Sequence, residues 1–282
     1  MSRSVPRVLD CNGRALDLSA PRVMGILNVT PDSFSDGGRY NSVAAAVERA
    51  QRMVEEGAAI IDVGGESTRP GSPPVPLHEE LERVVPVVEA LAKAIDVPIS
   101  VDTTKPEVMR AAVAAGAGLI NDIMALQAPG ALEAAAELQV PVCLMHMQGV
   151  PRTMQERPEY RDVVAEVRQF LLDRVEACRQ AGLGDDKLLL DPGFGFGKTV
   201  GHNYRLLREL AVFASDGYPL LVGMSRKSML GQVLNLPVDQ RLHGSIAAAV
   251  IAVWNGAAIV RVHDVRPTVE AITVVQAAKS LS

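Results

Sequence analysis

The residues best suited to chemistry stand at the ends of short apolar runs, along the whole length of the chain. The polar residues in these places are Asn28, Asp62, Asp102, Asn121, Asp122, His146, Asp191, Ser225, Arg226, Lys227, Arg261 and His263. They offer hydrogen-bond acceptors, donors and fixed positive charge. A single polar residue after a strand is commonly a helix cap, and we expect that role for Asp62 and Asp122. The complete set instead indicates a binding site where the runs end.

Eight apolar runs alternate with alanine-rich stretches of helical character. They lack strict period-two alternation, which is typical of parallel strands buried on both faces. The strands are expected at 23–28, 59–62, 98–102, 118–121, 141–145, 187–191, 219–223 and 258–261, with helices at 43–56, 79–94, 106–115, 130–138, 161–181, 204–213, 245–255 and 268–279. This order predicts an α/β fold, a (β/α)8 TIM barrel whose active site lies at the carboxyl ends of the strands. An open doubly wound sheet is the alternative, but its usual strand count is lower.

The segment before the first barrel strand, residues 8–17, contains an Asn12-Gly13 pair between two short runs. This pattern predicts an N-terminal β-hairpin, which we expect to cover the closed end of the barrel. No linker or low-complexity tract interrupts the chain. Its 282 residues fit a single barrel domain spanning 1–282.

Composition limits the class of protein. Apolar residues make up 48% and charged residues 22%, and the formal charge is −5, which does not favour a nucleic acid as partner. No apolar run approaches the roughly 18 residues of a membrane span, and the N-terminus lacks an apolar signal core. The three cysteines stand far apart without a CxxC pair. We therefore expect a cytoplasmic protein that binds neither membrane nor nucleic acid.

Two polar, glycine-containing loops follow the first two predicted strands. Residues 30–38 have the composition of a mobile lid, although an ordinary turn with Asx hydrogen bonds would have a similar composition. Residues 64–71 offer the hydroxyl of Thr68 and the guanidinium of Arg69, and arginine suits bidentate binding of phosphate oxygens. A surface salt bridge is the other interpretation of Arg69.

Several familiar motifs can be excluded. Residues 191–199 fail the phosphate-loop pattern because Pro192 stands where the first glycine belongs, so we expect a tight loop that brings Phe194 or Phe196 to a planar ligand. Met145 is expected as a pocket wall and His146 as a structural residue, because neighbouring side chains on a strand do not converge on a metal. Without a catalytic zinc pattern or an activated nucleophile, the chemistry must depend on binding and charge stabilisation.

Six segments together resemble the signature blocks of the dihydropteroate synthases. They are residues 24–38, 61–71, 99–107, 190–198, 223–228 and 261–264, in family order and spanning nearly the whole chain. The resemblance implies a transferase of folate biosynthesis, and a target of sulfonamide drugs. Its reaction joins (7,8-dihydropterin-6-yl)methyl diphosphate to 4-aminobenzoate, giving 7,8-dihydropteroate and diphosphate with Mg2+ as helper ion.

The resemblance also implies roles for individual residues. The pterin would be bound by Asp102, Asn121, Met145, Asp191, Phe196, Lys227 and Arg261. The diphosphate would be bound by Asn28, Thr68, Arg69, Arg261 and His263, with Asn28 as the Mg2+ ligand. The 4-aminobenzoate would lie against Phe34, Thr68, Pro70, Lys227 and Ser228. The catalytic group would comprise Asp32, Asp102, Lys227 and Arg261.

Two other functions remain to be distinguished. A related methyltetrahydrofolate methyltransferase would not need the diphosphate-binding set. A non-catalytic pterin-binding paralogue would not need the complete lid sequence at 30–38. The family is usually homodimeric, and the expected helix at 245–254 is apolar on most faces. We therefore expect a homodimer.

Overall fold

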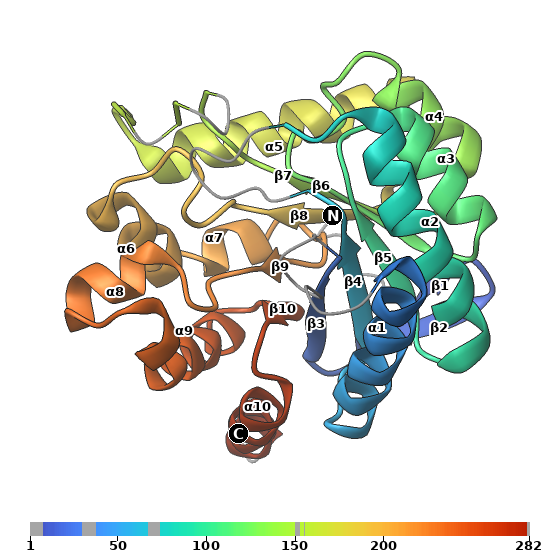
Figure 1. Ribbon diagram of the computed structural model, residues 1–282. Helices are drawn as coiled ribbons and strands as arrows, with labels where there is room; N and C mark the ends of the chain where they lie inside the picture. The colour runs from blue at the N-terminus through green and yellow to red at the C-terminus, as the bar shows by residue number, and fades with distance from the viewer. Residues whose placement is uncertain (1–7, 30–37, 67–73, 150–152, 155, 281–282) are drawn as a thin grey trace.

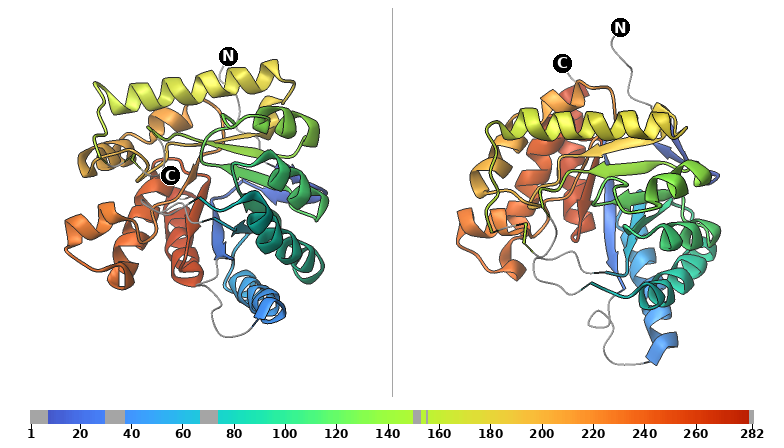
Figure 2. Two further views of the ribbon diagram at one scale, coloured as in Figure 1. Left: turned by 45° about the horizontal axis from the view of Figure 1, so that its top comes forward. Right: turned by 90° about the horizontal axis from the view of Figure 1, so that it is seen from above.

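The computed structural model describes residues 8–29, 38–66, 74–149, 153–154 and 156–280. Within them, eight parallel strands form one sheet in the order β8-β7-β6-β5-β4-β3-β10-β9. A parallel bridge between Leu190 and Leu220 joins the two ends of this sheet and closes it into a barrel. Helices surround the strands on the outside (Figures 1 and 2). The predicted (β/α)8 barrel is confirmed.

The elements follow one another as strand and helix. The strands are β1 (Val8–Cys11), β2 (Arg14–Asp17), β3 (Arg22–Asn28), β4 (Ile60–Gly64), β5 (Ile99–Asp102), β6 (Leu119–Asp122), β7 (Val142–Met145), β8 (Leu188–Asp191), β9 (Leu221–Val222) and β10 (Ile259–Val262). The helices are α1 (Gly38–Glu55), α2 (Leu77–Ala94), α3 (Pro106–Ala114), α4 (Ala131–Leu138), α5 (Val163–Gln180), α6 (Val200–Arg208), α7 (Ala211–Ala214), α8 (Ser228–Leu234), α9 (Leu242–Trp254) and α10 (Val265–Ser280). Short 3-10 turns occupy η2 (Asp185–Lys187) and η3 (Val238–Gln240).

The main apolar core lies between the strands and the helices. In α2, Val84, Val87, Val88 and Leu91 are buried at the i, i+3, i+4, i+7 spacing that turns one helical face to the sheet. All five residues of β4 are buried, as expected for a parallel strand covered on both sides. Among the described residues, no helix is long and apolar enough to cross a membrane.

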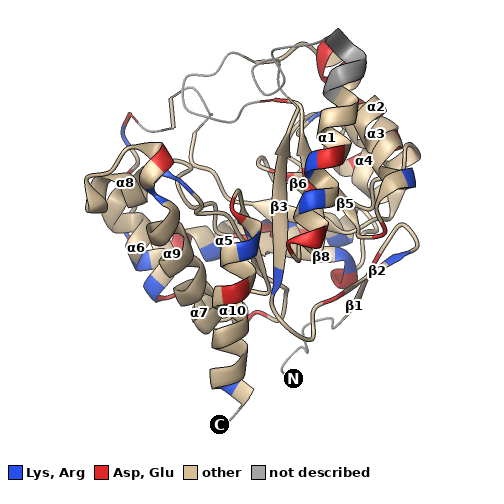
Figure 3. Ribbon diagram, turned by 60° about the horizontal axis from the view of Figure 1, so that its bottom comes forward, with Lys and Arg blue, Asp and Glu red and all other residues tan. Residues whose placement is uncertain are grey.

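The N-terminal hairpin closes one end of the barrel (labels β1 and β2 in Figure 3). Its turn places Asn12 at φ 56° and Gly13 at φ 81°, the left-handed region that a tight two-residue hairpin turn requires. The hairpin and the first inward residues of the strands form one buried cluster: Leu9, Cys11, Leu16, Met24, Ile60, Leu119, Cys143, Leu189, Leu221 and Ile259. The prediction that the hairpin covers the closed end is therefore confirmed.

The helices differ from the prediction in two places. The helix expected at 204–213 is two helices, α6 and α7, and α6 begins earlier because the Thr199 hydroxyl and the His202 ring form a capping box. Helix α8 was not predicted. It has seven residues and follows a turn at Arg226, so its apolar pattern is too short to be recognised in the sequence.

The hairpin plug gives a prediction about stability. Leu9 is 1% exposed, whereas Val8 beside it is 56% exposed. Leu9→Ala would leave a cavity in the closed barrel end, so we expect the free energy of unfolding to fall by about 2–5 kcal/mol. Val8→Ala should change it by no more than about 0.5 kcal/mol. Urea unfolding would measure both, and equal losses would show that the hairpin is not part of the core.

Candidate active site

A buried cluster of charged and amide side chains lies toward the ends of four strands inside the barrel. Arg261 of β10 donates from Nε to Asp62 Oδ2 of β4 at 2.6 Å and from Nη2 to Asp102 Oδ2 of β5 at 2.8 Å. Asn121 of β6 donates from Nδ2 to the same Asp62 oxygen at 3.3 Å. Asp62 is fully buried and Asp102 is 9% exposed. Four strands thus contribute to one charged layer.

Strand geometry explains why these groups meet. Residues two positions apart on a strand face the same side. Four polar residues of the layer therefore stand above apolar residues of the closed end, in the pairs Ile60 and Asp62, Leu119 and Asn121, Leu189 and Asp191, and Ile259 and Arg261, whereas Asp102 stands above the buried Ser100. The lower lumen is filled mainly by apolar side chains, and the upper lumen is lined by charges and amides.

The opposite wall of the upper lumen combines an aromatic face with a lysine. The ammonium of Lys227 lies 4.5 Å from the centre of the Phe196 ring and donates to the Phe194 carbonyl at 2.5 Å. Asp191 accepts the backbone N–H of Gly193 at 2.7 Å. A small apolar cluster continues this wall, formed by Ile123, Met145, Met154 and Phe196. A flat ring with a polar edge would meet apolar surface and hydrogen-bonding groups together.

A strained turn after β9 presents Lys227. Arg226 has φ 60°, which is unfavourable for a residue with a side chain. Its guanidinium forms two hydrogen bonds to Asp264, at 2.6 and 3.1 Å, and its N–H donates to Ser245 Oγ at 2.9 Å. These bonds hold the turn in a conformation that directs Lys227 into the barrel mouth, and backbone strain of this kind is often found at functional sites.

Burial and neighbouring charges alter the protonation of the cluster. Burial raises the pKa of Asp102 to about 7, although Arg261 opposes the shift. Burial also raises the pKa of Asp191 and lowers that of Lys227 to about 8. Burial disfavours the charge of Arg261, but Asp62 and Asp102 outweigh it and raise its pKa. The pKa values of Asp102 and Lys227 therefore both lie close to neutral pH.

The remaining predicted site residues lie at the rim or outside the described part of the chain. Asn28 is exposed at the end of β3, and Ser228 is exposed at the start of α8. His263 follows β10, and its Nδ1 lies 3.0 Å from Ser225 Oγ. The predictions for Asp32, Phe34, Thr68, Arg69 and Pro70 fall outside the described residues.

The expectation of a helix cap was wrong for both Asp62 and Asp122. Asp62 is not a cap, because its carboxylate lies inside the barrel and binds Arg261 and Asn121. The signal that could have revealed it is the period of two from Ile60, which packs on the hairpin. Asp122 does act locally, accepting the N–H groups of Met124 and Leu126, both at 2.8 Å, although it caps a turn and not a helix.

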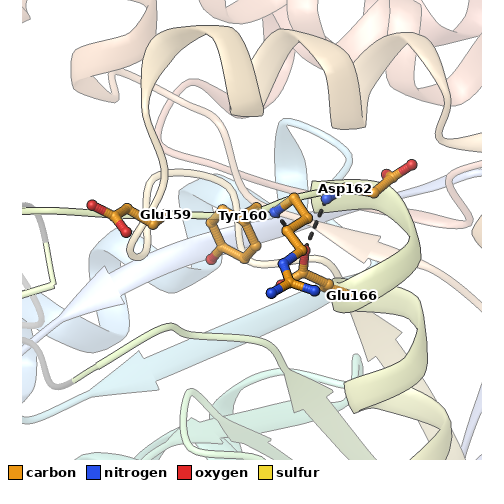
Figure 4. A pocket seen from close by; sticks show the side chains of 5 residues that line it. Glu159, Tyr160, Asp162 and Glu166 are labelled. Atoms are coloured by element: carbon orange, nitrogen blue, oxygen red, sulfur yellow. Dashed lines mark hydrogen bonds between the residues drawn. The ribbon is translucent and has the colours of Figure 1, made fainter.

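A second hollow lies away from this layer, beside the start of α5 (Figure 4). It is lined by Glu159, Tyr160, Arg161, Asp162 and Glu166. Glu166 Oε1 accepts the backbone N–H groups of Arg161 and Asp162, at 2.7 and 2.8 Å. These contacts give the backbone N–H groups at the start of α5 a hydrogen-bond partner. The hollow shares no residue with the barrel layer, so we do not assign it a catalytic role.

Comparisons with known proteins agree with the geometry of the barrel layer. A family model described as pterin binding enzyme matches residues 24–263, which defines the class of the protein. The dihydropteroate synthase of Escherichia coli strain K12 is 61% identical over 272 residues, 96% of each chain. This chain belongs to the dihydropteroate synthases.

Two solved structures show the same fold at high identity. The Yersinia pestis dihydropteroate synthase, in complex with a sulfonamide drug, has a TM-score of 0.92 and 58% identity, covering 97% of this chain and 99% of that chain. The Xanthomonas albilineans dihydropteroate synthase, in complex with 7,8-dihydropteroate, has a TM-score of 0.88 and 52% identity, covering 96% of this chain and 98% of that chain. The barrel and its hairpin are thus those of this enzyme family.

The protonation of the cluster gives a prediction about pH. If Asp102 binds the N–H groups of a pterin, it must be ionised, so pterin affinity should rise as pH increases through about 7. Affinity should fall again as Lys227 loses its proton above about 8. Calorimetric dissociation constants measured between about pH 5.5 and 9 would show this profile.

Two variants separate Asp102 from the other buried aspartates with a raised pKa, Asp122 and Asp191. Burial raises the pKa of Asp122 to about 6 and also raises that of Asp191, so both could contribute to the acid limb. Asp102→Asn should remove the part of the acid limb near pH 7, and Asp122→Asn should retain it, because Asp122 lies outside the layer. A profile that is flat in the unchanged protein, or an acid limb lost only in Asp122→Asn, would contradict the assignment.

Proposed function

We propose that the upper lumen of the barrel is the site where this chain joins (7,8-dihydropterin-6-yl)methyl diphosphate to 4-aminobenzoate, in the biosynthesis of folate. The observation that carries the proposal is the buried layer of Asp102, Asn121 and Arg261, with Asp191 and Lys227 completing it. The product-bound and sulfonamide-bound relatives support the choice of reaction.

The layer matches the hydrogen-bonding edge of a pterin. Its amino-pyrimidine edge presents N–H donors beside a carbonyl, and Asp102 and Asp191 can accept from such donors. Asn121 can donate and accept, and Lys227 can donate to the ring carbonyl or a ring nitrogen. Met145 and Phe196 belong to the apolar cluster that would cover a face of the ring. The site therefore selects a flat heterocycle by its edge and its face together.

Charge stabilisation of the leaving diphosphate is the main catalytic demand. Breaking the C–O bond leaves negative charge on the diphosphate and positive charge on the pterin methylene. Arg261 and His263, with Thr68 and Arg69, would bind the departing oxygens, while Asp102 and Lys227 hold the pterin. An aromatic amine is neutral near pH 7, so attack on the pterin carbon requires no strong base. We assign the catalytic group as Asp32, Asp102, Lys227 and Arg261.

Asn28 is the proposed ligand of Mg2+. Among the described residues, no group of three or more acidic, histidine or cysteine side chains could hold a metal. A Mg2+ ion that is brought by a diphosphate needs few protein ligands, because water and phosphate oxygens fill most positions. Asn28 is exposed at the strand end, and its Oδ1 lies beside Gly64, as does Asp102 Oδ2. This single oxygen donor fits an ion that would neutralise the leaving group.

The second substrate would bind at the mouth, outside the pterin. Ser228 is exposed directly after Lys227, and we assign both to the 4-aminobenzoate site with Phe34, Thr68 and Pro70. A sulfonamide resembles 4-aminobenzoate in its aromatic amine and its anionic end. The sulfonamide complex of the Yersinia pestis enzyme supports the proposal that such drugs compete here.

We further propose that one domain over 1–282 forms a homodimer in the cytoplasm. Apolar side chains are exposed on neighbouring helices, with Ile251 and Trp254 of α9 at 44% and 56% and Val274 of α10 at 70%. Helix α9 contacts α10, so these side chains can form one surface. A monomer mass by light scattering at micromolar concentration would contradict the dimer.

The direct test of the proposed function is product formation. We expect 7,8-dihydropteroate from the dihydropterin diphosphate and 4-aminobenzoate, with a rate that depends on Mg2+. Asp102→Asn should lower kcat/KM by roughly 100-fold or more, because a charged hydrogen-bond acceptor is lost at a buried site. Asp122→Asn, which alters an aspartate outside the layer, should stay within about tenfold of the original value. Pterin binding without any product would indicate the non-catalytic paralogue instead.

A further inference from the structure

Lys198 is a buried lysine to which the proposed reaction gives no role. It ends the glycine-rich loop 193–197 and is 3% exposed. Its ammonium does not face a phosphate site. It lies behind the loop, where Nζ is 2.8 Å from the Gly193 carbonyl, 3.0 Å from the Phe196 carbonyl, 2.9 Å from His146 Nδ1 and 3.3 Å from the His146 carbonyl. Lys198 therefore ties the loop after β8 to the end of β7.

The contacts match the donor capacity of an ammonium. A charged lysine has three N–H donors and no acceptor, and the three shortest contacts take one donor each. Burial, and the charge of Lys198, lower the pKa of His146 to about 3. The ring is thus neutral at neutral pH, and Nδ1 is free to accept the third hydrogen bond. His146 is structural, as predicted, and serves as an anchor for Lys198.

The loop is held from both sides. On the barrel side, Asp191 accepts the N–H of Gly193 and Lys227 donates to the carbonyl of Phe194. On the outer side, Lys198 holds the carbonyls of Gly193 and Phe196. Two residues from other elements complete the restraint: Asn203 accepts the N–H of Gly195 at 2.7 Å, and the Tyr160 hydroxyl donates to the Gly197 carbonyl at 2.8 Å.

The loop conformation needs this restraint. Gly193, Gly195 and Gly197 have φ of 70°, 81° and 60°. Every second residue of the loop is thus in the left-handed region of φ, which glycine adopts readily because it has no side chain. Without bonds to its carbonyls, such a segment would sample many conformations. The ring of Phe196 and the carbonyl of Phe194 would then lose their fixed positions next to Lys227.

We propose that Lys198 is a positioning residue for the pterin site, which fixes the Phe196 ring and, through the Phe194 carbonyl, the ammonium of Lys227. The proposal rests on the pterin-binding roles given above to Phe196 and Lys227. Lys198 does not touch the substrate in this scheme. It acts by removing the conformational freedom of the loop before the pterin binds.

The energetics distinguish this role from simple stabilisation. Burial lowers the pKa of Lys198 well below its usual value, with Asp191 opposing the shift and Lys227 adding to it. Lys198→Met would leave the buried carbonyls of Gly193 and Phe196 without a donor, so it should lower the stability of the fold as well as the pterin affinity. A positioning role is distinguished because its loss of affinity depends on Phe196, whereas a loss of stability alone does not.

A double-mutant cycle on pterin affinity tests the proposal. Calorimetry with a non-reactive dihydropterin would give dissociation constants for Lys198→Met, Phe196→Ala and the double variant. We expect Lys198→Met to weaken binding roughly tenfold, and the double variant to bind no more than about threefold more weakly than Phe196→Ala, because the part of the effect that acts through the Phe196 ring is already lost. A residue that acts independently of Phe196 would instead give effects that multiply.

Lys187 provides the matched control. Its ammonium also donates to a backbone carbonyl, that of Gln139, but it stands before β8 at the other end of the strand. Lys187→Met should leave the pterin dissociation constant within about twofold, alone or combined with Phe196→Ala. Thermal unfolding of each variant would separate loss of fold from loss of affinity.

The outcomes divide clearly. An unchanged dissociation constant in Lys198→Met with a lower melting temperature would overturn the proposal, as would effects that multiply in the cycle. If Lys198→Met does not fold, Lys198→Gln retains N–H donors to the carbonyls and is measured in the same cycle. Non-multiplying effects in a protein that forms no dihydropteroate would support the positioning role while contradicting the proposed synthase activity. An unchanged affinity in Phe196→Ala would overturn the role of Phe196 and this proposal together.

Discussion

One guanidinium shared by two buried carboxylates organises the upper half of the barrel. Arg261 reaches Asp62 and Asp102, at 2.6 and 2.8 Å, from a strand that is paired with neither of theirs. Its single positive charge cannot balance two carboxylates in a medium that solvates charge poorly. Burial is the main cause that raises the pKa of Asp102 to about 7, and the nearby charge of Asp62 adds to it, while Arg261 opposes the shift. The charges of Asp191 and Lys227 lie close to this group and influence one another.

The rest of the fold makes this layer possible. The hairpin and the first inward residues of the strands fill the closed end with a buried apolar cluster, so the charged groups lie above apolar side chains. The period of two along each strand then places carboxylate, amide and guanidinium at one level. The turn at Arg226 and the glycine-rich loop after β8 bring Lys227 and Phe196 to the mouth. The buried apolar clusters form the core, and the proposed binding groups lie in the layer above the closed end.

The order of strands and helices along the chain and the polar residues at the strand ends could be predicted, because both are local patterns in the sequence. The positions of Asp102, Asn121, Asp191 and Arg261 followed directly from the ends of apolar runs, and the barrel followed from their number. The role of Asp62 was missed, because an aspartate after a strand has the same sequence appearance whether it caps a helix or faces the lumen, unless the period of two from Ile60 is followed. Lys198 was equally hidden, since only the folded loop shows which way its side chain turns. Short elements such as α8 also carry too few residues for a periodic signal.

A crystal structure of the chain with a bound dihydropterin would test the central claim most directly. The account predicts that the amino-pyrimidine edge lies within hydrogen-bond distance of Asp102 and Asp191, with the ring against Phe196 and Met145. It also predicts that the loop at 193–197 keeps its conformation when the ligand binds. A pterin bound elsewhere, for example in the hollow beside α5, with the buried layer unchanged, would contradict it.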